Sequence, residues 1–447
     1  MNINPNALAG LVLGILVTLV ANAPASAAIG TLDRVPAATL LLPYFEVDLA
    51  DPNGPQTRFT VANASPDPTL AHATLWSDTG VPTFSFDLYV GGRGSVEVDL
   101  RLLFSGVVPQ TAPGNFSAGP DSSPHVAVAN CPLAATALYA GMPVLDRLSD
   151  SQVAHLRAAH TGQASALFGN MCAGASHGDA IARGYVTIDA VNSCSSNFPT
   201  DPNYFVSGGS GIASNANVLF GQYTAIERGN RVTAASPLVS IEASSTDLLT
   251  NTAGNYTFYA GYDGANAADN REPLGTVWEA RYLDVGFFDP GTELIVWRDP
   301  GFAHSPFTCG SLPADFPRQQ TEIAAFDEQE QVSFLNGGNV YPNPPPLPIY
   351  PFPLIAQRVA VEDLSPFRGG FVHLNLNASP PGSVASTSGL LQSFVAVRHR
   401  LGGTFGAALP ASYLLGPQHQ PSGPGSCPQY PDPLYTYCDS RPARVGY

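Results

Sequence analysis

The stretch TFSFDLYV (Thr83–Val90) decides the fold class, because its side chains alternate strictly between apolar and polar. In an extended chain, one side carries the apolar residues Phe84, Phe86, Leu88 and Val90, and the other carries the polar residues Ser85 and Asp87. A period of two is that of a β-strand with one buried face and one solvent-facing side. The next stretch, GSVEVDLRLLF (Gly94–Phe104), alternates in the same way after a glycine-rich turn. Together they predict an antiparallel hairpin.

Similar short apolar stretches recur along the chain between glycines and prolines. The 447 residues include 43 Gly and 42 Pro, with 44% hydrophobic and 12% charged residues. Such a composition suits many short strands joined by turns. We expect an all-β fold made of two related antiparallel β-sandwich halves with long loops and one short inserted helix. The first half spans residues 28–248 with a loop and helix insertion at about 105–180, and the second spans residues 249–447.

The inserted helix is predicted by its capping pattern. Ser149 can cap the N-terminus, and Gln152 stands at the capping-box position three residues later. Leu156 and Ala159 then lie on one helical face, and Gly162 suits the C-terminal end. In the second half, the Pro-rich segment 341–353 is expected to be extended polyproline.

Two tryptophan motifs indicate that the halves are related. LWSDTG (Leu75–Gly80) and VWRDPG (Val296–Gly301) share the pattern W-x-D-x-G, and they contain two of the three tryptophans in the chain. Later in each half, GYVTID (Gly184–Asp189) and GFVHLN (Gly370–Asn375) follow in the same order. We interpret this as a duplicated unit in which Trp76 and Trp297 take equivalent, buried places. The alternative is that all-β proteins share such turn and aromatic patterns by default.

The motif has a structural explanation and a functional one. In the structural reading, Trp packs into the sandwich, Asp accepts hydrogen bonds from the turn backbone, and Gly supplies a positive φ. The residues concerned are Trp76, Asp78, Gly80, Trp297, Asp299 and Gly301. In the functional reading, two exposed tryptophans stack on sugar rings, so the exposure of the indoles separates the two.

The N-terminus resembles a signal peptide. An apolar run from Leu8 to Val20 is followed by Ala25-Ser26-Ala27, which fits a cleavage site after residue 27. The segment before the run has no Lys or Arg, which leaves an uncleaved anchor as the alternative. The run is short for a membrane span, so we expect cleavage and a mature protein without a span. The expected location is the periplasm, the cell surface or the extracellular space.

The cysteines agree with export. There are six, an even number that predicts disulfides in an oxidising compartment: Cys131, Cys172, Cys194, Cys309, Cys427 and Cys438. Cys427 and Cys438 flank a short loop in the Pro-rich tail and are expected to pair. For Cys172, both Cys131 and Cys194 are plausible partners.

Charge and residue usage exclude some functions. The 35 acidic residues outnumber the 19 basic ones, which gives a formal net charge of −16. Such a surface repels phosphate backbones, so we expect no nucleic-acid partner. Every basic residue is Arg. A chain without Lys has neither a P-loop lysine nor a Schiff-base lysine.

Catalytic and metal-binding patterns are weak. GASHG (Gly174–Gly178) matches the nucleophile elbow G-x-S-x-G, but no strand precedes it and no helix follows it. His373 shares a face with Asn375 opposite Val372 and Leu374, which indicates an exposed position. The segments Gly370–Ser379 and Leu390–Leu401 are expected to form a hairpin with a long loop, on which His373 and His399 could be cross-strand neighbours.

One loop is a candidate calcium site. The stretch YDGANAADNRE (Tyr262–Glu272) gathers the oxygen-bearing side chains Asp263, Asn266, Asp269 and Glu272. Calcium prefers oxygen ligands, although the spacing is not that of an EF-hand and a solvated turn is the alternative. The sequence predicts no other cofactor.

Taken together, the sequence favours a non-enzymatic cell-envelope or extracellular protein of binding, adhesion or structural type, and its partner is unknown. The alternative is an exported carbohydrate-active protein, either a binding module or a glycoside hydrolase. A glycan or an envelope component is the expected kind of partner.

Overall fold

The computed structural model describes residues 34–109, 147–227, 231–245, 257–262, 269–284, 291–318, 320, 322–335, 350–376, 391–400, 406–410 and 412–415. The predicted signal peptide, Cys131, Cys427, Cys438 and most of the Pro-rich segment lie outside these residues. Within them, no helix is long and apolar enough to cross a membrane.

The first sandwich consists of two antiparallel sheets. Sheet 1a has five strands in the order β4 (Pro82–Val90), β3 (Thr69–Ser77), β6 (Ile181–Val191), β1 (Thr39–Asp48) and β9 (Val239–Ile241). Sheet 1b has four strands in the order β5 (Ser95–Asp99), β2 (Gln56–Asn63), β7 (Leu219–Glu227) and β8 (Arg231–Pro237).

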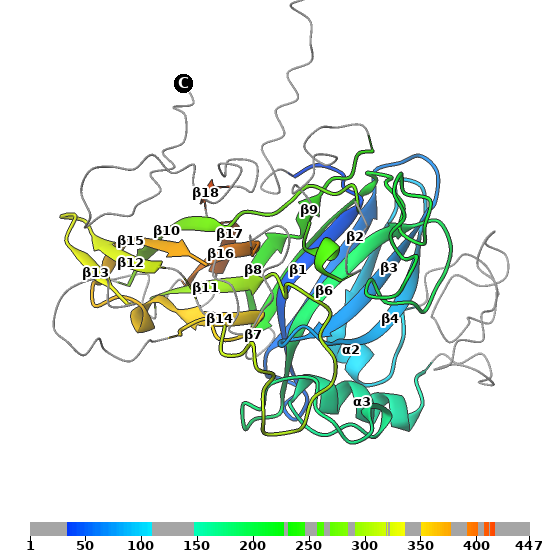
Figure 1. The fold of residues 1–447 in the computed structure, drawn as a ribbon, viewed down its shortest axis with the longest axis horizontal. Helices are drawn as coiled ribbons and strands as arrows, with labels where there is room; N and C mark the ends of the chain where they lie inside the picture. The colour runs from blue at the N-terminus through cyan, green and yellow to red at the C-terminus, as the bar shows by residue number, and fades with distance from the viewer. Residues whose placement is uncertain are drawn as a thin grey trace, which may run out of the picture.

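The second sandwich is built in the same way and lies beside the first (Figure 1). Sheet 2a has the order β13 (Val332–Phe334), β12 (Glu322–Asp327), β15 (Gly369–Asn375), β10 (Val277–Leu283) and β18 (Ser412–Leu415). Sheet 2b has the order β14 (Ala356–Ala360), β11 (Gly291–Arg298), β16 (Ser393–Arg400) and β17 (Gly406–Pro410). The predicted all-β sandwich fold is confirmed.

Period-two alternation explains the core of the first sandwich. Phe84, Phe86 and Leu88 of β4 are buried against residues of sheet 1b such as Phe59 and Val61. These side chains alternate along their strands, so each strand places one apolar row between the two sheets. At about 1.5–3 kcal/mol for each fully buried large apolar side chain, this core is a main source of stability.

The two sandwiches have the same strand order. Adding nine to each label of β4-β3-β6-β1-β9 gives β13-β12-β15-β10-β18, and adding nine to β5-β2-β7-β8 gives β14-β11-β16-β17. Hydrogen bonds at the strand ends are repeated as well. Ser77 N donates to Val81 O (2.9 Å), and Asp327 N donates to Gln331 O (3.0 Å) in the corresponding turn.

Two glycines mark the common register. Gly184 of β6 lies opposite Ser77, and Gly370 of β15 lies opposite Asp327. A Cβ atom at Gly184 would lie 2.0 Å from Trp76 O, and one at Gly370 would lie 1.8 Å from Phe326 O. The predicted match of Gly184–Asp189 with Gly370–Asn375 therefore agrees with the register.

The predicted equivalence of Trp76 and Trp297 is wrong. Trp76 lies in β3, whose counterpart is β12, whereas Trp297 lies in β11, whose counterpart is β2. By register, the counterpart of Trp76 is Phe326, because Trp76 pairs with Tyr185 and Phe326 pairs with Phe371. The counterpart of Trp297 is Ala62. The shared letters W-x-D-x-G therefore come from strands in different positions of the fold.

Two predicted hairpins are also wrong. β4 lies in sheet 1a and β5 in sheet 1b, so the turn Gly91–Gly94 connects the two sheets instead of joining two hydrogen-bonded strands. The predicted hairpin of residues 370–400 is wrong in the same way. β15 belongs to sheet 2a and β16 to sheet 2b, so the chain crosses between the sheets here, as it does from β6 to β7. His373 pairs with Glu279 and Ala324, and His399 pairs with Thr292 and Ala407. The two histidines are not cross-strand neighbours.

Short helices lie at one end of the first sandwich (Figure 1). The predicted helix is α3 (Asp150–His160), and its capping box between Ser149 and Gln152 is confirmed. A second helix, α2 (Leu100–Phe104), replaces the end of a predicted strand, because Asp99 caps the N–H groups of Arg101 and Leu102. Single 3-10 turns form η1 (Ala166–Phe168), η2 (Phe258–Gly261) and η4 (Val361–Asp363).

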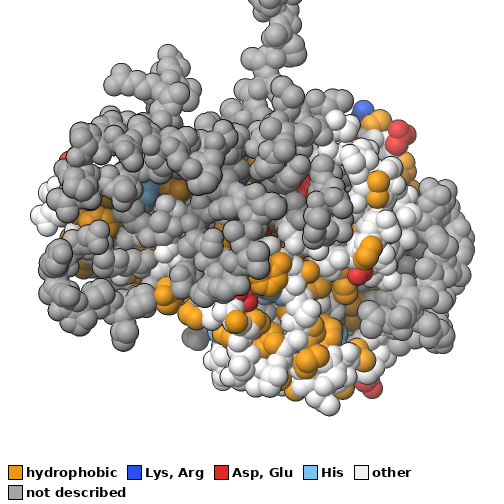
Figure 2. Space-filling view, in the orientation of Figure 1, with side chains coloured by type: hydrophobic (Ala, Val, Ile, Leu, Met, Phe, Trp, Pro, Cys, Tyr) orange, Lys and Arg blue, Asp and Glu red, His pale blue; other side chains and the backbone are white. Residues whose placement is uncertain are grey.

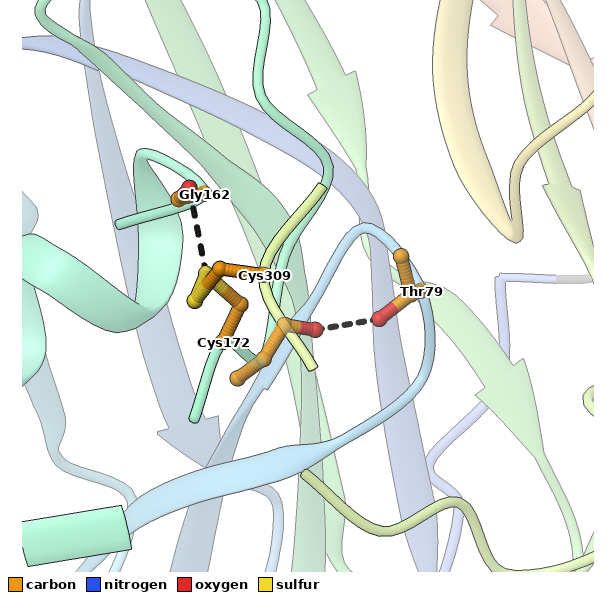
Figure 3. Close-up of a disulfide and its surroundings, with 5 residues drawn as sticks. Thr79, Gly162, Cys172 and Cys309 are labelled. Atoms are coloured by element: carbon orange, nitrogen blue, oxygen red, sulfur yellow. Dashed lines mark hydrogen bonds between the residues drawn. A yellow bond between two sulfur atoms is a disulfide. The ribbon is translucent and has the colours of Figure 1, made fainter. Parts of the chain in front are cut away.

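A disulfide joins Cys172 to Cys309, which corrects both partners expected for Cys172. Cys194 is disulfide-bonded too. Figure 3 shows the Cys172–Cys309 bond beside the turn that holds Thr79, whose hydroxyl donates to Ala173 O. The bond links the segment after α3 to the chain after β11, across 137 residues. Sequence spacing alone could not reveal it, because the two cysteines meet only through the packing of the halves.

Candidate binding surface

The two tryptophan motifs meet at the junction between the sandwiches. The Trp76 ring stacks on Tyr185 of the same sheet, with centroids 5.6 Å apart and an interplanar angle of 2°. Trp297 of sheet 2b contacts Tyr185 edge-on, with the two ring centroids 5.8 Å apart. Both tryptophans are 0% exposed. They therefore pack sheet 1a against sheet 2b and are not available to stack on a sugar ring.

The turns after the tryptophans also contribute to the junction. Asp78 Oδ1 accepts from Ala175 N (2.9 Å), and its carbonyl accepts from Ile355 N of the second half (2.9 Å). Asp299 Oδ1 accepts from Gly301 N (2.7 Å), and burial raises the pKa of Asp299 to about 6.

The glycines of these turns, Gly80 and Gly301, have φ values of 84° and 80°. Such left-handed conformations favour glycine over residues with a side chain. The motif residues thus hold turns and connect the halves.

Ion pairs continue the junction beside the aromatic cluster. Arg358 of β14 contacts Glu46 of β1 (3.1 Å) and Glu227 of β7 (3.4 Å), so it connects sheet 2b to both sheets of the first half. Arg398 of β16 also contacts Glu227 (2.9 Å). Opposite charges that are partly withdrawn from water fix the orientation of the two sandwiches.

The face of sheet 1a that was expected to be solvent-facing is buried. Ser85 and Asp87 of β4 are 5% and 0% exposed. His72 Nδ1 lies 2.7 Å from Asp87 Oδ1, and both side chains are fully buried. Burial raises the pKa of Asp87, and the hydrogen bond from His72 opposes this shift. The alternation was interpreted correctly as a strand, but loops and the second half cover the polar face.

A buried carboxylate ties these loops to the sheet. Asp189 of β6 accepts hydrogen bonds from Tyr204 Oη (3.0 Å) and Tyr259 Oη (3.2 Å), which come from two separate loops. The Thr39 hydroxyl donates to the same carboxylate. Since Asp189 is 0% exposed, this network reaches no solvent and binds the loops down.

Ser176 of the G-x-S-x-G stretch is exposed and lies in a segment that precedes strand β6. The nucleophile elbow requires the opposite order, a strand followed by a helix. The neighbouring His177 donates through Nε2 to Asp78 Oδ2 at 2.8 Å. This contact attaches the segment to the turn of the first tryptophan motif.

The candidate calcium loop is only partly described. Asp263 and Asn266 lie outside the described residues. Asp269 is buried and accepts from Thr257 Oγ1 and Arg271 N, and burial raises its pKa to about 6. Glu272 accepts from Glu242 N (3.3 Å). Among the described residues, no cluster of three or more His, Cys, Asp or Glu could hold a metal, and the calcium site stays a prediction.

One sheet carries large apolar side chains on an open face. Val332 and Phe334 of β13 and Phe371 of β15 are 44%, 41% and 45% exposed. Phe326 of β12 lies in register with both Val332 and Phe371, so it joins them in one row. We call the surface formed by Phe326, Val332, Phe334 and Phe371 the apolar face of sheet 2a. Hydrophobic side chains are visible at this end of the molecule in Figure 2.

Charged side chains border the apolar face. Arg281 of β10 lies with its guanidinium carbon 5.7 Å from the Phe371 ring centroid and bonds Glu328 at 3.0 Å. Glu279, two residues before Arg281, is exposed on the same side and pairs with His373. An apolar centre with a charged border is the usual composition of a protein-binding surface.

The sequence contains a signal for this face that the strand patterns concealed. In GFVHLN, Val372 and Leu374 supply the buried row, so Phe371 must point away from the core. A large aromatic on the outward side of a strand distinguishes this apolar face from an ordinary solvent-facing side. Its neighbours on β12 and β13 come from a different part of the sequence and only the fold brings them together.

Comparison with known proteins adds no relative: no protein-family model, no curated protein and no solved structure matches this chain.

Proposed function

We propose that this chain is an exported, non-enzymatic β-sandwich protein of the cell envelope or extracellular space that binds a protein surface through the apolar face of sheet 2a. Export is supported by the leader-like residues 1–27 and by the disulfide bonding of Cys172, Cys194 and Cys309. We attribute the common strand order of the halves to a tandem duplication.

The observation that carries the binding proposal is a contrast between equivalent positions. Trp76 and Tyr185 in sheet 1a are both 0% exposed, because the second half packs on them. Their counterparts Phe326 and Phe371 keep the aromatic character, yet Phe371 remains 45% exposed. Aromatic residues at these two positions form an interface in the first half, which supports the same role in the second.

Site-specific photocrosslinking tests the binding proposal. A photoreactive phenylalanine analogue replaces Phe371 in the full chain, expressed in its native host. The matched control carries it at Phe220, which is equally exposed at 45% but lies on sheet 1b. We expect a covalent protein adduct from position 371 and none from position 220. Absence of any adduct from position 371 in cells that contain the folded protein contradicts the proposal.

Cell fractionation and N-terminal sequencing test export. We expect the mature protein outside the cytoplasm, with an N-terminus near residue 28. A glycan array with the purified protein examines the carbohydrate alternative. The burial of Trp76 and Trp297 removes the stacking platform on which that alternative was based.

A further inference from the structure

We propose that the partner of the apolar face is the same face of a second copy of this chain, so that two molecules pack sheet 2a on sheet 2a about a twofold axis. This inference rests on the proposed function, because it names the partner of that surface.

The chain itself contains the interface from which we argue. In the first half, the outer face of sheet 1a buries Trp76 and Tyr185 by packing against the outer face of another sheet. Sheet 2a has the same strand order and register, and it places Phe326 and Phe371 at these positions. The surface that this fold uses to accept a second sheet is thus present twice and occupied once within the described residues.

In a head-to-tail arrangement, the apolar face of one copy would contact sheet 1b of the next copy. That contact lacks the interactions that hold the two halves of one chain together. Sheet 2b docks on sheet 1a through Trp297 and Arg358, and its cations Arg358 and Arg398 also contact Glu227 of sheet 1b. The surface of a second copy that corresponds to sheet 2b is sheet 1b.

In sheet 1b, however, the three corresponding residues are Ala62, Glu97 and Thr224. This surface supplies neither the aromatic anchor nor the two positive charges. Sheet 1b is therefore a poor partner for the apolar face, and a head-to-tail chain of molecules is disfavoured.

The apolar face, in contrast, is complementary to itself. It supplies its own anchors, since Phe334, Phe371 and Val332 are each more than 40% exposed. It also carries both signs of charge, with Arg281 58% and Glu328 48% exposed at its border. Across a twofold axis, the arginine of one copy can meet the acidic residues of the other, as an isologous interface requires. Twofold dimers are also the commonest assemblies of identical chains.

The test uses the purified, oxidised mature protein. Light scattering coupled to size-exclusion chromatography measures its molar mass from low to high micromolar concentrations. We expect a dimer for the wild type and a monomer for Phe371→Glu, because the twofold axis brings the two new carboxylates together in an apolar contact. Such like-charge contacts are unfavourable, so the dissociation constant of the dimer should rise at least about tenfold.

The control variant is Phe220→Glu, which places the same charge at an equally exposed phenylalanine on sheet 1b. It should remain a dimer, and both variants should keep the wild-type circular dichroism because the replaced rings are exposed. A wild type that is monomeric at every concentration overturns the inference, as does a Phe371→Glu dimer or equal dissociation by both variants.

The two proposals fail differently. If position 371 crosslinks to another protein while the purified chain is monomeric, the twofold dimer is wrong and binding through the apolar face stands. If the adduct has the mass of two chains, both proposals are supported. If position 371 gives no adduct, both fail.

Discussion

His160 is a buried imidazole whose surroundings favour the neutral form. Its Nε2 lies 2.7 Å from Thr83 Oγ1, and its Nδ1 lies 2.9 Å from Arg183 O. Burial lowers the pKa of His160 to about 4, although the hydrogen bond to Arg183 O opposes this. In the unfolded chain the pKa is about 6.5. Between these values the unfolded chain binds a proton that the folded protein does not, so acid destabilises the fold.

We predict that His160→Gln removes this pH dependence. The free energy of unfolding of the wild type, relative to the variant, should fall as the pH decreases from about 6.5 to about 4, by about 3 kcal/mol in total. Urea titrations followed by tryptophan fluorescence at several pH values measure the difference. The variant must serve as the reference, because the raised pKa values of Asp269 and Asp299 act in the opposite direction. Parallel pH profiles for the two proteins contradict the prediction.

Gly184 and Gly370 are required because the backbone of a neighbouring strand occupies the place of a side chain. An added Cβ would lie 2.0 Å or less from Trp76 O or Phe326 O, and a backbone carbonyl cannot move aside cheaply. We predict that Gly184→Ala and Gly370→Ala each lower the free energy of unfolding by about 1–3 kcal/mol. Gly91→Ala is the control, since nothing lies within 4 Å of its added Cβ. Equal effects of all three substitutions in urea titrations would falsify this reading.

At the scale of elements, single strands were predictable and their partners were not. The alternation in β4 and β15 depends on side chains only one or two residues apart, so the sequence identifies such strands. β15 and β16 could form a hairpin within one sheet or lie in different sheets. Both arrangements give the same alternation of apolar and polar side chains, so the sequence does not distinguish them. The end of β5 shows an error of a local kind. The alternating pattern predicts a strand through Phe104, but Asp99 caps a helix and Leu100–Phe104 form α2.

The Cys172–Cys309 bond acts between elements of the two halves. It closes a loop of 137 residues, and constraints on long loops remove much entropy from the unfolded chain. We predict that Cys172→Ser with Cys309→Ser lowers the free energy of unfolding by about 2–4 kcal/mol. Urea titration of the purified double variant measures the loss.

Peptide mapping without reduction checks the bond itself. The wild type should give a peptide that contains Cys172 joined to Cys309. A peptide that joins Cys172 to Cys194 contradicts the structure. In that case the stability of the double variant no longer reports on a link between the halves.

At the scale of the whole molecule, the tryptophan echo shows what a sequence can and cannot reveal. The expectation of two related sandwiches agrees with the common strand order, although the residues that suggested it are not equivalent. Trp76 and Trp297 resemble each other because each lies on its own side of one junction and is followed by a turn that contacts the other half. The open face of sheet 2a was not predicted from the sequence. Recognising it requires the observation that the corresponding face of sheet 1a is covered by the second half.

The contacts across the same junction should make the two sandwiches unfold as one cooperative unit. Trp297 contacts Tyr185 of the first half and Phe258 of the connecting segment, with the latter centroids 4.6 Å apart. Removal of a fully buried indole leaves a cavity and costs about 3–5 kcal/mol. In this protein the cavity would lie between the two sandwiches, where the first has a separate core and the core of the second is continuous with the junction. Removal of the indole should therefore weaken the coupling between the halves more than it lowers the stability of either sandwich.

We predict that Trp297→Ala separates the unfolding of the two halves. Differential scanning calorimetry should show one cooperative transition for the wild type and two for the variant. Phe220→Ala is the control, because this exposed ring lies away from the junction and its loss should leave a single transition. A single transition that Trp297→Ala only shifts to a lower temperature contradicts the prediction. The aromatic cluster would then contribute stability without coupling the halves. In that case the ion pairs of Arg358 and Arg398 are the coupling contacts to remove next.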